Sequence, residues 1–452
     1  MFSFFYPLYA RRSTLLKMGK TIAEKILSSH AGRDLKAGDF AICKIDFTFA
    51  QDGTSSIVID RIKELGIKQL ETKFCMVIDH SAPSPSEGVS RVHKKMRSFA
   101  KEFNVHLYDI GCGVCHHVIP ESGQILPGDL VLGADSHTCT HGALGAFSTG
   151  VGSTDLAIAL ATGKNWFKVP KTVKIIITGK APKGVFAKDI ILYIIKKIGA
   201  DGVTYKAVEF SGAVIDEMDM DGRFTVCNMV VEMGAKVGFM PRDKKTLNWL
   251  KAITPKCEKN NFVEADKDAE YESVLKFDIS KLKPLVACPH AVDNVKSIDE
   301  LKNASLDKSV IGSTNKTFAC RVKINEAFLG TCTNGRLNDL LVAASILKAR
   351  KVAFGVKLII APASKAIFLD ALKLGLIDIF IKAGAVVVSP GCGSCVGTHN
   401  GVPADGEIVI SSANRNFKGR MGNPNAFIYL ASPATVAASA IKGYIADPRE
   451  FL

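Results

Sequence analysis

Short runs of β-branched and aliphatic residues alternate with longer segments of helical periodicity, and this alternation constrains the fold most strongly. The runs are continuously apolar, which is typical of strands buried on both faces of a parallel sheet. The alternation therefore predicts an α/β fold with helices on both sheet faces. Strands are expected at 75–79, 173–179, 356–362, 385–390 and 407–412, and helices at 19–29, 57–66, 154–163, 187–198, 337–350, 364–374 and 434–445.

The segment STDLAIALATG carries signals for both ends of one of these helices. Ser153 or Thr154 is expected to cap the first turn, where Asp155 also complements the helix dipole. Gly163 follows the last periodic residue and is expected to end the helix.

The length of 452 residues exceeds what one ordinary core accommodates, so two to four domains are expected. A hydrophobic content of 47% with 23% charged residues is typical of a globular protein. The sequence has no uninterrupted apolar stretch of about 18 residues, so it predicts no membrane-spanning helix. Residues 251–316 are more polar and are expected to form an interdomain connection with some structure of its own.

The net charge of +14 is compatible with an anionic substrate, an acidic partner or nucleic acid. The lysines are spread along the chain, and the sequence contains no arginine-rich arm, interleaved aromatic motif or helix-turn-helix signal. Nucleic-acid binding is therefore disfavoured.

Residues 1–17 begin with an apolar stretch that precedes two arginines, which is the reverse of a secretory signal. We interpret them as an upstream extension, with Met18 as the start and a cytoplasmic location. The alternative is an organellar transit peptide, because the stretch contains arginine and serine without acids.

Two Cys-x-x-Cys pairs occur in glycine-rich loops, Cys112 with Cys115 and Cys392 with Cys395. A four-cysteine zinc site normally has its pairs about 15–20 residues apart, whereas most of the chain separates these two pairs, so a zinc site is disfavoured. Neither pair has the setting of a thioredoxin-like redox dithiol. With Cys332, the second pair could hold three irons of a [4Fe–4S] cluster and leave the fourth open. The equally weighted alternative is that these are inert thiols in tight turns.

Histidines and carboxylates concentrate in the glycine-bracketed loops, several of which follow expected strands. A carboxylate on one imidazole nitrogen raises the basicity of the other, so such pairs suit acid–base chemistry. A structural role remains the alternative for each histidine. The candidates are Asp79, His80, His116, Asp135, His137 and Glu232, with His117, His141 and His399 as neighbours.

The segment NRNFKGR follows the expected strand at 407–412 and supplies Asn414, Arg415 and Arg420. Arginine forks bind carboxylates and phosphates, so a substrate-binding role is favoured over a surface ion pair. The sequence lacks the P-loop motif and a G-x-G-x-x-G that opens a helix, so a nucleotide enzyme is disfavoured.

The segments DSHTCTHGALGAFSTGVGSTD, GTCTNGR, PGCGSC and NRNFKGR together resemble the aconitase superfamily, and within it the large subunits of 3-isopropylmalate dehydratases. The resemblance runs from about Met18 to the C-terminus. It implies three α/β domains around a central iron–sulfur cluster, approximately at 18–130, 131–310 and 311–452. It also implies that the swivelling fourth domain is a separate small subunit, which is the expected partner.

The resemblance also implies one [4Fe–4S] cluster per chain, held by Cys332, Cys392 and Cys395, with one iron not ligated by protein. His80, paired with Asp79, would protonate the leaving hydroxyl of the substrate. The remaining implied site residues are His116 with Asp135 and His137 with Glu232, which would orient and protonate water, and Ser136, Asn414, Arg415 and Arg420, which would contact the substrate or the cluster.

The implied activity is a hydro-lyase that interconverts 2- and 3-isopropylmalate in leucine biosynthesis. Homoaconitate and 2,3-dimethylmalate are alternative substrates, because Gln51, Ser56, His117 and His141 depart from residues common in the family. A cluster-free RNA-binding regulator and an electron-transfer protein are remote alternatives. The three cysteines disfavour the regulator, and the acid–base loops disfavour electron transfer.

Overall fold

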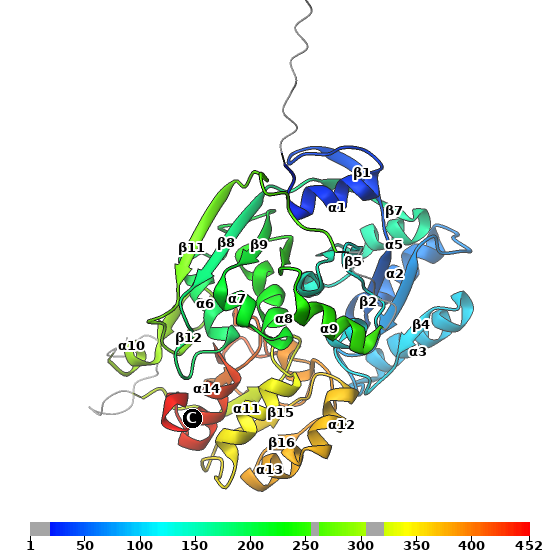
Figure 1. Cartoon of the computed structure of the whole chain (residues 1–452). Helices are drawn as coiled ribbons and strands as arrows, with labels where there is room; N and C mark the ends of the chain where they lie inside the picture. Colours follow the sequence, from blue (N-terminus) through cyan, green and yellow to red (C-terminus); the bar gives the residue numbers. More distant parts are fainter. Residues whose placement is uncertain (1–18, 255–261, 304–320) are drawn as a thin grey trace, which may run out of the picture.

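The computed structural model describes residues 19–254, 262–303 and 321–452. The expected extension at 1–17 and the expected start at Met18 lie outside the described residues. The described chain contains a two-stranded ribbon and sheets of four, five and seven strands. Figure 1 shows these sheets with helices packed around them, as the alternating pattern predicts. In these residues, no helix is long and apolar enough to cross a membrane.

The five-stranded sheet is parallel throughout and lies near the N-terminus. Alternate residues of one strand enter different cores: Phe74 and Met76 pack with the N-terminal helices, whereas Cys75 and Val77 join the central core. Burial on both faces explains why this strand reads as a continuous apolar run. In order across the sheet, the strands are β4 (His106–Tyr108), β3 (Lys73–Val77), β2 (Phe47–Gln51), β5 (Leu130–Gly133) and β6 (Phe147–Gly150).

The other two sheets hold the remaining expected strands. The four-stranded sheet is parallel and comprises β10 (Val237–Phe239), β9 (Ala207–Ser211), β8 (Thr172–Thr178) and β11 (Ser273–Asp278). The seven-stranded sheet comprises β13 (Val295–Ser297), β12 (Leu285–Ala287), β18 (Phe427–Ala431), β17 (Ile408–Ser411), β14 (Glu326–Leu329), β15 (Lys357–Ile360) and β16 (Val386–Val387). The ribbon pairs β1 (Phe40–Lys44) with β7 (Lys164–Lys168).

The two approximate domain borders expected at 130 and 310 each fall within the stretch of chain that contributes strands to one sheet. The first border falls at the start of β5, although the sheet that contains β5 continues to β6. The second border follows β12 and β13, which pair with β18 in the seven-stranded sheet. These short strands lie in the polar stretch at 251–316, where neither length nor periodicity marks them.

All seven expected helices occur, and α6 (Ala187–Ile198) has the expected bounds. The helix expected at 154–163 begins one residue earlier, because Gly152 and not Ser153 or Thr154 is its N-cap. The other expected helices are α1 (Ile22–Ala31), α2 (Asp52–Glu64), α5 (Ser153–Thr162), α11 (Leu337–Leu347), α12 (Lys365–Lys373) and α14 (Pro433–Lys442).

Further helices were not expected from the sequence, and several are short or polar. The α-helices are α3 (Glu87–Phe103), α4 (Cys115–Glu121), α7 (Ala213–Glu217), α8 (Met220–Asn228), α9 (Lys244–Ile253), α10 (Ile298–Asn303) and α13 (Leu376–Ala383). The 3-10 helices are η1 (Ser136–Leu144), η2 (Met229–Met233), η4 (Gly393–Val396) and η5 (Pro448–Glu450).

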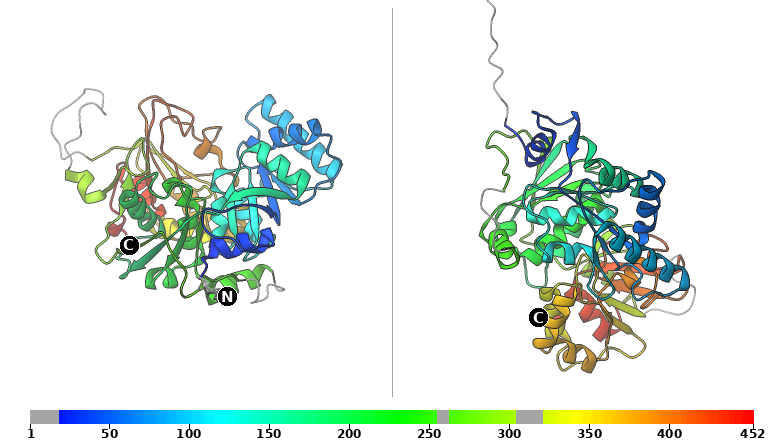
Figure 2. Two further views of the ribbon diagram at one scale, coloured as in Figure 1. Left: turned by 90° about the horizontal axis from the view of Figure 1, so that it is seen from above. Right: turned by 90° about the vertical axis from the view of Figure 1, so that its right-hand side faces the viewer.

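The five-stranded sheet and the parallel part of the seven-stranded sheet direct the carboxyl-terminal ends of their strands toward the candidate site. Strands β14, β15, β16 and β17 are neighbours in parallel, so the loops that follow them leave from the same sheet edge. Figure 2 shows the five-stranded sheet, in blue and cyan, beside the rest of the molecule, with an orange segment between them. Loops from separate sheets therefore meet.

The buried side chain of Lys188 on α6 ties the four-stranded-sheet region to the loop after β17. Its Nζ donates hydrogen bonds to the carbonyl oxygens of Ser412 at 2.8 Å and Ala413 at 2.6 Å. These residues directly precede Asn414, so the two hydrogen bonds stabilise the loop that carries this candidate site residue.

We predict that Lys188→Met lowers the free energy of unfolding by about 3 kcal/mol, because two buried carbonyls lose their donor. Urea unfolding of the full chain measures this change. Lys196→Met is the matched control on the exposed side of α6, with an expected change within about 0.5 kcal/mol. Equal effects of the two substitutions would contradict the role assigned to Lys188.

Candidate active site

The loops after β14 and β16 bring Cys332, Cys392 and Cys395 together in a buried region. The ten cysteines in the described part of the chain are all free thiols. Asn414 Nδ2 donates a hydrogen bond to Cys332 Sγ at 3.1 Å, and Arg420 Nη2 donates one to Cys395 Sγ at 3.4 Å. Two loops thus supply the sulfur atoms, and the loop after β17 supplies the N–H groups that donate to two of them.

Burial raises the pKa of the Cys332 thiol to about 11, and neighbouring Cys395 adds to this rise while Arg420 opposes it. Burial also raises the pKa of Cys392. Buried thiols that lie near one another resist ionisation unless a cation neutralises them. A metal centre supplies such positive charge, so this donor set fits an iron–sulfur cluster better than it fits inert thiols in turns.

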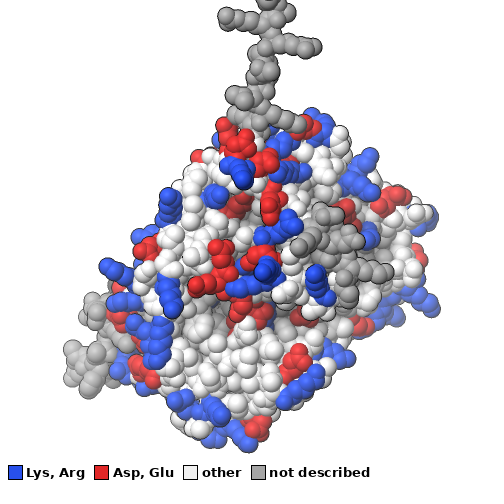
Figure 3. Space-filling view, viewed as in Figure 1, with Lys and Arg blue, Asp and Glu red and all other residues white. Residues whose placement is uncertain are grey.

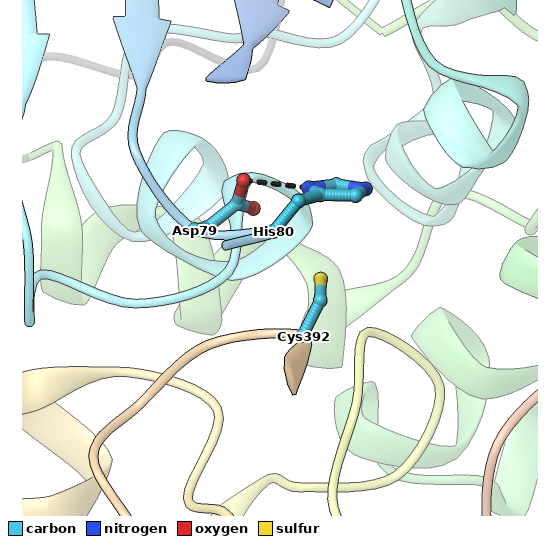
Figure 4. A group of neighbouring side chains, drawn as sticks. All are labelled: Asp79, His80 and Cys392. Atoms are coloured by element: carbon cyan, nitrogen blue, oxygen red, sulfur yellow. Dashed lines mark hydrogen bonds and ion pairs between the residues drawn. The ribbon is translucent and has the colours of Figure 1, made fainter. Parts of the chain in front are cut away.

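The cysteine loop packs closely against the loop after β3. Cys392 N donates to the carbonyl oxygen of Asp79 at 2.8 Å. A Cβ at Gly391 would lie 3.0 Å from that same oxygen, so the close approach favours glycine. Figure 4 shows the Cys392 sulfur directed toward Asp79 and His80, and potential ligand atoms of these three residues lie within 4.8 Å of one another.

Three histidine–carboxylate pairs surround this region, and they are the pairs anticipated from the sequence. The distances are 2.7 Å for His80 Nδ1 to Asp79 Oδ1, 2.8 Å for His116 Nε2 to Asp135 Oδ1, and 2.8 Å for His137 Nε2 to Glu232 Oε1. The structure therefore brings these six residues together, whereas their catalytic roles stay predictions.

Asp135 links the pairs to one another. Besides His116, its carboxylate accepts a hydrogen bond from the backbone N–H of His137 at 2.8 Å, and its Oδ2 lies 3.4 Å from His80 Nε2. Burial opposes ionisation of Asp135, but His116 and His80 hold its pKa well below the usual value. For His80, burial acts downward, but Cys392 and Asp79 raise the pKa well above the usual value. These neighbours therefore favour the protonated form of the His80 imidazole.

The pair formed by His137 and Glu232 has a different charge state. Burial lowers the pKa of His137 to about 4, against the effect of its hydrogen bond to Glu232. Arg415 Nε donates to Glu232 Oε1 at 2.8 Å, and hydrogen bonds from His137 and Arg415 lower the pKa of Glu232 despite burial. Neutral His137 thus lies beside an anionic carboxylate. Ser136 Oγ lies 3.5 Å from the second nitrogen of this histidine.

Two site residues escaped the sequence analysis. Asp52 accepts hydrogen bonds from the backbone N–H groups of Asp79 at 3.1 Å, His80 at 2.7 Å and Ser81 at 2.8 Å. Its Oδ2 also lies 3.4 Å from Nε2 of the buried His93. The available signal was its place directly after β2, next to the strands that lead to Asp79 and Asp135.

The other missed residue is Asn228, at the end of α8. Its Oδ1 accepts from Asn414 Nδ2 at 3.2 Å and from Thr333 Oγ1 at 3.1 Å, and its Nδ2 donates to Thr140 Oγ1 at 2.8 Å. Asn228 therefore connects loops from three regions. A single asparagine at the end of a helix gives no specific signal in the sequence.

Neighbouring residues mostly support the site loops. Cys115 N donates to Asp79 Oδ2 at 2.7 Å, and His399 Nε2 lies 3.1 Å from the carbonyl oxygen of Ala82. Among the departures from the family pattern, Gln51 Nε2 lies 3.4 Å from Asp135 Oδ2. Ser56 Oγ accepts a hydrogen bond from Lys95. His117 contacts the backbone of Thr331 and Cys332. His141 Nδ1 lies 3.2 Å from Ser148 Oγ.

Comparisons with known proteins find matches over most of the chain. Residues 24–443 match the Aconitase family (aconitate hydratase). The chain is 50% identical over 436 residues to 3-isopropylmalate dehydratase large subunit 1 of Thermotoga maritima, covering 96% of this chain and 100% of that protein. The same identity and coverage hold for 3-isopropylmalate dehydratase large subunit 2 of Archaeoglobus fulgidus. A solved structure, Thermococcus kodakaraensis aconitase X, aligns with a TM-score of 0.48 and 12% identity over 87% of this chain and 88% of that one.

The family match covers most of the chain, and the relatives align over their whole length. On this basis, the chain belongs to the aconitase family.

Proposed function

We propose that this chain is the large subunit of a 3-isopropylmalate dehydratase, a hydro-lyase of leucine biosynthesis that interconverts 2- and 3-isopropylmalate. The observation that carries the proposal is the 50% identity to proteins of that name over 96% of the chain. The charges of the site support it. The His80 imidazole, whose pKa is raised, and the Arg420 guanidinium both lie beside the cysteines, and cationic donors of this kind suit a hydroxy-dicarboxylate.

Cys332, Cys392 and Cys395 would hold one [4Fe–4S] cluster, and the hydrogen bonds to their sulfur atoms would offset its negative charge. When bound, such a cluster supplies a Lewis acid at an iron that has no protein ligand. The chain's own residues then have to position the substrate and move protons.

His80 is the candidate proton donor to the leaving hydroxyl. Asp79 holds its Nδ1, so its Nε2 is the nitrogen available for transfer, and Asp52 fixes the loop by accepting from three backbone N–H groups. The raised pKa of His80 favours the protonated form that a proton donor needs. The Asp135 carboxylate, 3.4 Å from Nε2, stabilises this charged form.

The other two pairs would orient water. His116, fixed by Asp135, and neutral His137, fixed by Glu232, each present one remaining ring nitrogen. Ser136 and Arg415 would bind substrate carboxylates beside them, with Arg415 held in place by Glu232. Arg420 would share its guanidinium between Cys395 and the substrate.

A separate small subunit is the proposed partner, since the relatives are named large subunits. The cognate small subunit would complete the substrate pocket. An assay of the reconstituted pair on isopropylmalate, homoaconitate and 2,3-dimethylmalate decides among the substrates. The proposal expects isopropylmalate to have the highest kcat/KM, and a preference for either of the others would overturn it.

We predict that Cys332→Ser and Cys395→Ser each abolish binding of a stable cluster while the fold is retained, because a serine oxygen is a poor ligand for iron in such a cluster. Iron and acid-labile sulfide per chain after anaerobic reconstitution measure this loss. Cys43→Ala, a buried thiol on β1, is the control and should retain the cluster. Full cluster content in both serine variants would exclude these ligands.

Replacing the proposed proton donor, His80→Ala, should lower kcat about 10²–10⁴-fold, which is the usual contribution of a general acid. Steady-state kinetics of the reconstituted pair measure this effect, with circular dichroism to confirm folding. His106→Ala is the control, because His106 is exposed on β4. A kcat within twofold of wild type for His80→Ala would remove His80 from the mechanism.

Arg420→Lys tests substrate binding. Loss of the guanidinium fork removes one charge-assisted hydrogen bond, worth about 2 kcal/mol, so we expect KM to rise at least tenfold. Lys418→Arg, an exposed position in the same loop, should leave KM unchanged. An unchanged KM for Arg420→Lys would restrict Arg420 to its contact with Cys395.

A further inference from the structure

A cavity of about 230 Å³ adjoins the candidate site at α4. Its inner lining includes His116 and His117 of α4, and the sides are formed by α8, α9, α11 and α12. Ile253 of α9 and Ala366 and Asp370 of α12 also line it and are at least partly exposed. Figure 1 shows α9 and α12 on the same side of the molecule. The cavity thus extends from a site histidine toward the surface of the described chain.

Two histidine nitrogens in this region lack protein partners. His116 Nδ1 and His117 Nε2 are both buried, and neither finds a hydrogen-bond partner among the described residues. An unsatisfied buried polar group costs about 1–3 kcal/mol, so such groups normally bind ordered water. One water needs about 15 Å³ of such space, so this cavity has room for several beside its polar side chains.

Among the carboxylates that line the cavity, Glu121, at the end of α4, is the closest in sequence to both histidines. Ser364 Oγ donates to its Oε1 at 3.1 Å. Burial raises the pKa of Glu121 to about 7, against the effects of Ser364 and Arg336, while Asp221 and Asp370 add to the rise. Glu121 therefore gains and loses a proton near neutral pH, unlike an ordinary exposed glutamate.

We propose that this cavity is a water-filled second route to the active site and that Glu121 relays protons between solvent and His116. The relay rests on the proposed hydro-lyase function, because each turnover removes one water from the substrate and adds one back. A proton that leaves His116 Nδ1 passes to a cavity water, and that water passes one of its own protons to the Glu121 carboxylate. Glu121 then releases the proton to solvent, and the reverse sequence returns it.

The first test is a high-resolution crystal structure of the cluster-containing full chain. The expected result is ordered water within about 3.2 Å of both His116 Nδ1 and His117 Nε2, the limit for an N–H···O hydrogen bond. A dry cavity, or side chains that satisfy both nitrogens, would overturn the proposal. This test needs no substrate, so it decides the cavity's content even if the chain has no activity on isopropylmalate.

The second test compares pH profiles of kcat for the reconstituted pair. Glu121 accepts a proton only as a carboxylate, so wild-type kcat should fall as the pH decreases through about 7. Glu121→Gln cannot titrate, and we expect kcat at pH 8 to fall about tenfold and the step near pH 7 to disappear. Asp370→Asn is the matched control, because it removes another cavity carboxylate, and it should keep the step.

A steric variant separates water passage from the chemistry of Glu121. Ala366→Trp should partly block the exposed end of the cavity and lower kcat, whereas Leu369→Trp, which is exposed on the same helix and lies outside the cavity lining, should not. Unchanged kcat in Ala366→Trp together with an unchanged profile in Glu121→Gln would contradict the relay. Loss of wild-type activity on every hydroxy-dicarboxylate would instead contradict the proposed function.

Discussion

The carboxylate of Asp135 is the interaction on which the rest of the site depends. It lies at the end of β5 and contacts His116, the backbone of His137 and His80, which come from separate loops. A buried carboxylate is stable only when hydrogen bonds and positive charge compensate its lost hydration. The contacts that provide this compensation fix the positions of the three loops relative to one another. They also lower the pKa of Asp135 and raise that of His80.

Charge compensation also explains the surroundings of the cysteines. Three thiols near each other lie in a region where Asn414 and Arg420 direct N–H groups at sulfur. Lys188 and Asn228 hold the Asn414 loop from behind through buried hydrogen bonds. On the outer face shown in Figure 3, by contrast, basic and acidic side chains are interspersed over the described residues. The charges on this face are therefore mixed, unlike the ordered pairs of the site.

Much of the fold was predictable because its strongest signals are local. Continuous apolar runs such as 173–179 form strands, and α6 has its expected bounds because its apolar face and flanking residues define both ends. The sheet membership of β12 and β13 was not predictable, since three-residue strands in polar sequence have no distinctive period. Gly152 caps α5 through its backbone conformation, without a side-chain hydrogen bond that a motif could reveal.

The sequence by itself determined the alternating α/β pattern, the loops that carry reactive residues and the family resemblance, because each of these depends on residue type and spacing. The partners of those residues were decided by the tertiary structure. Asp52 supports the loop that contains His80, and Asn228 links three loops, across sequence distances that no local pattern encodes. The cavity beside Glu121 likewise exists only where several helices meet. Hydrogen bonds and burial are properties of neighbours in space, and the chain acquires those neighbours only on folding.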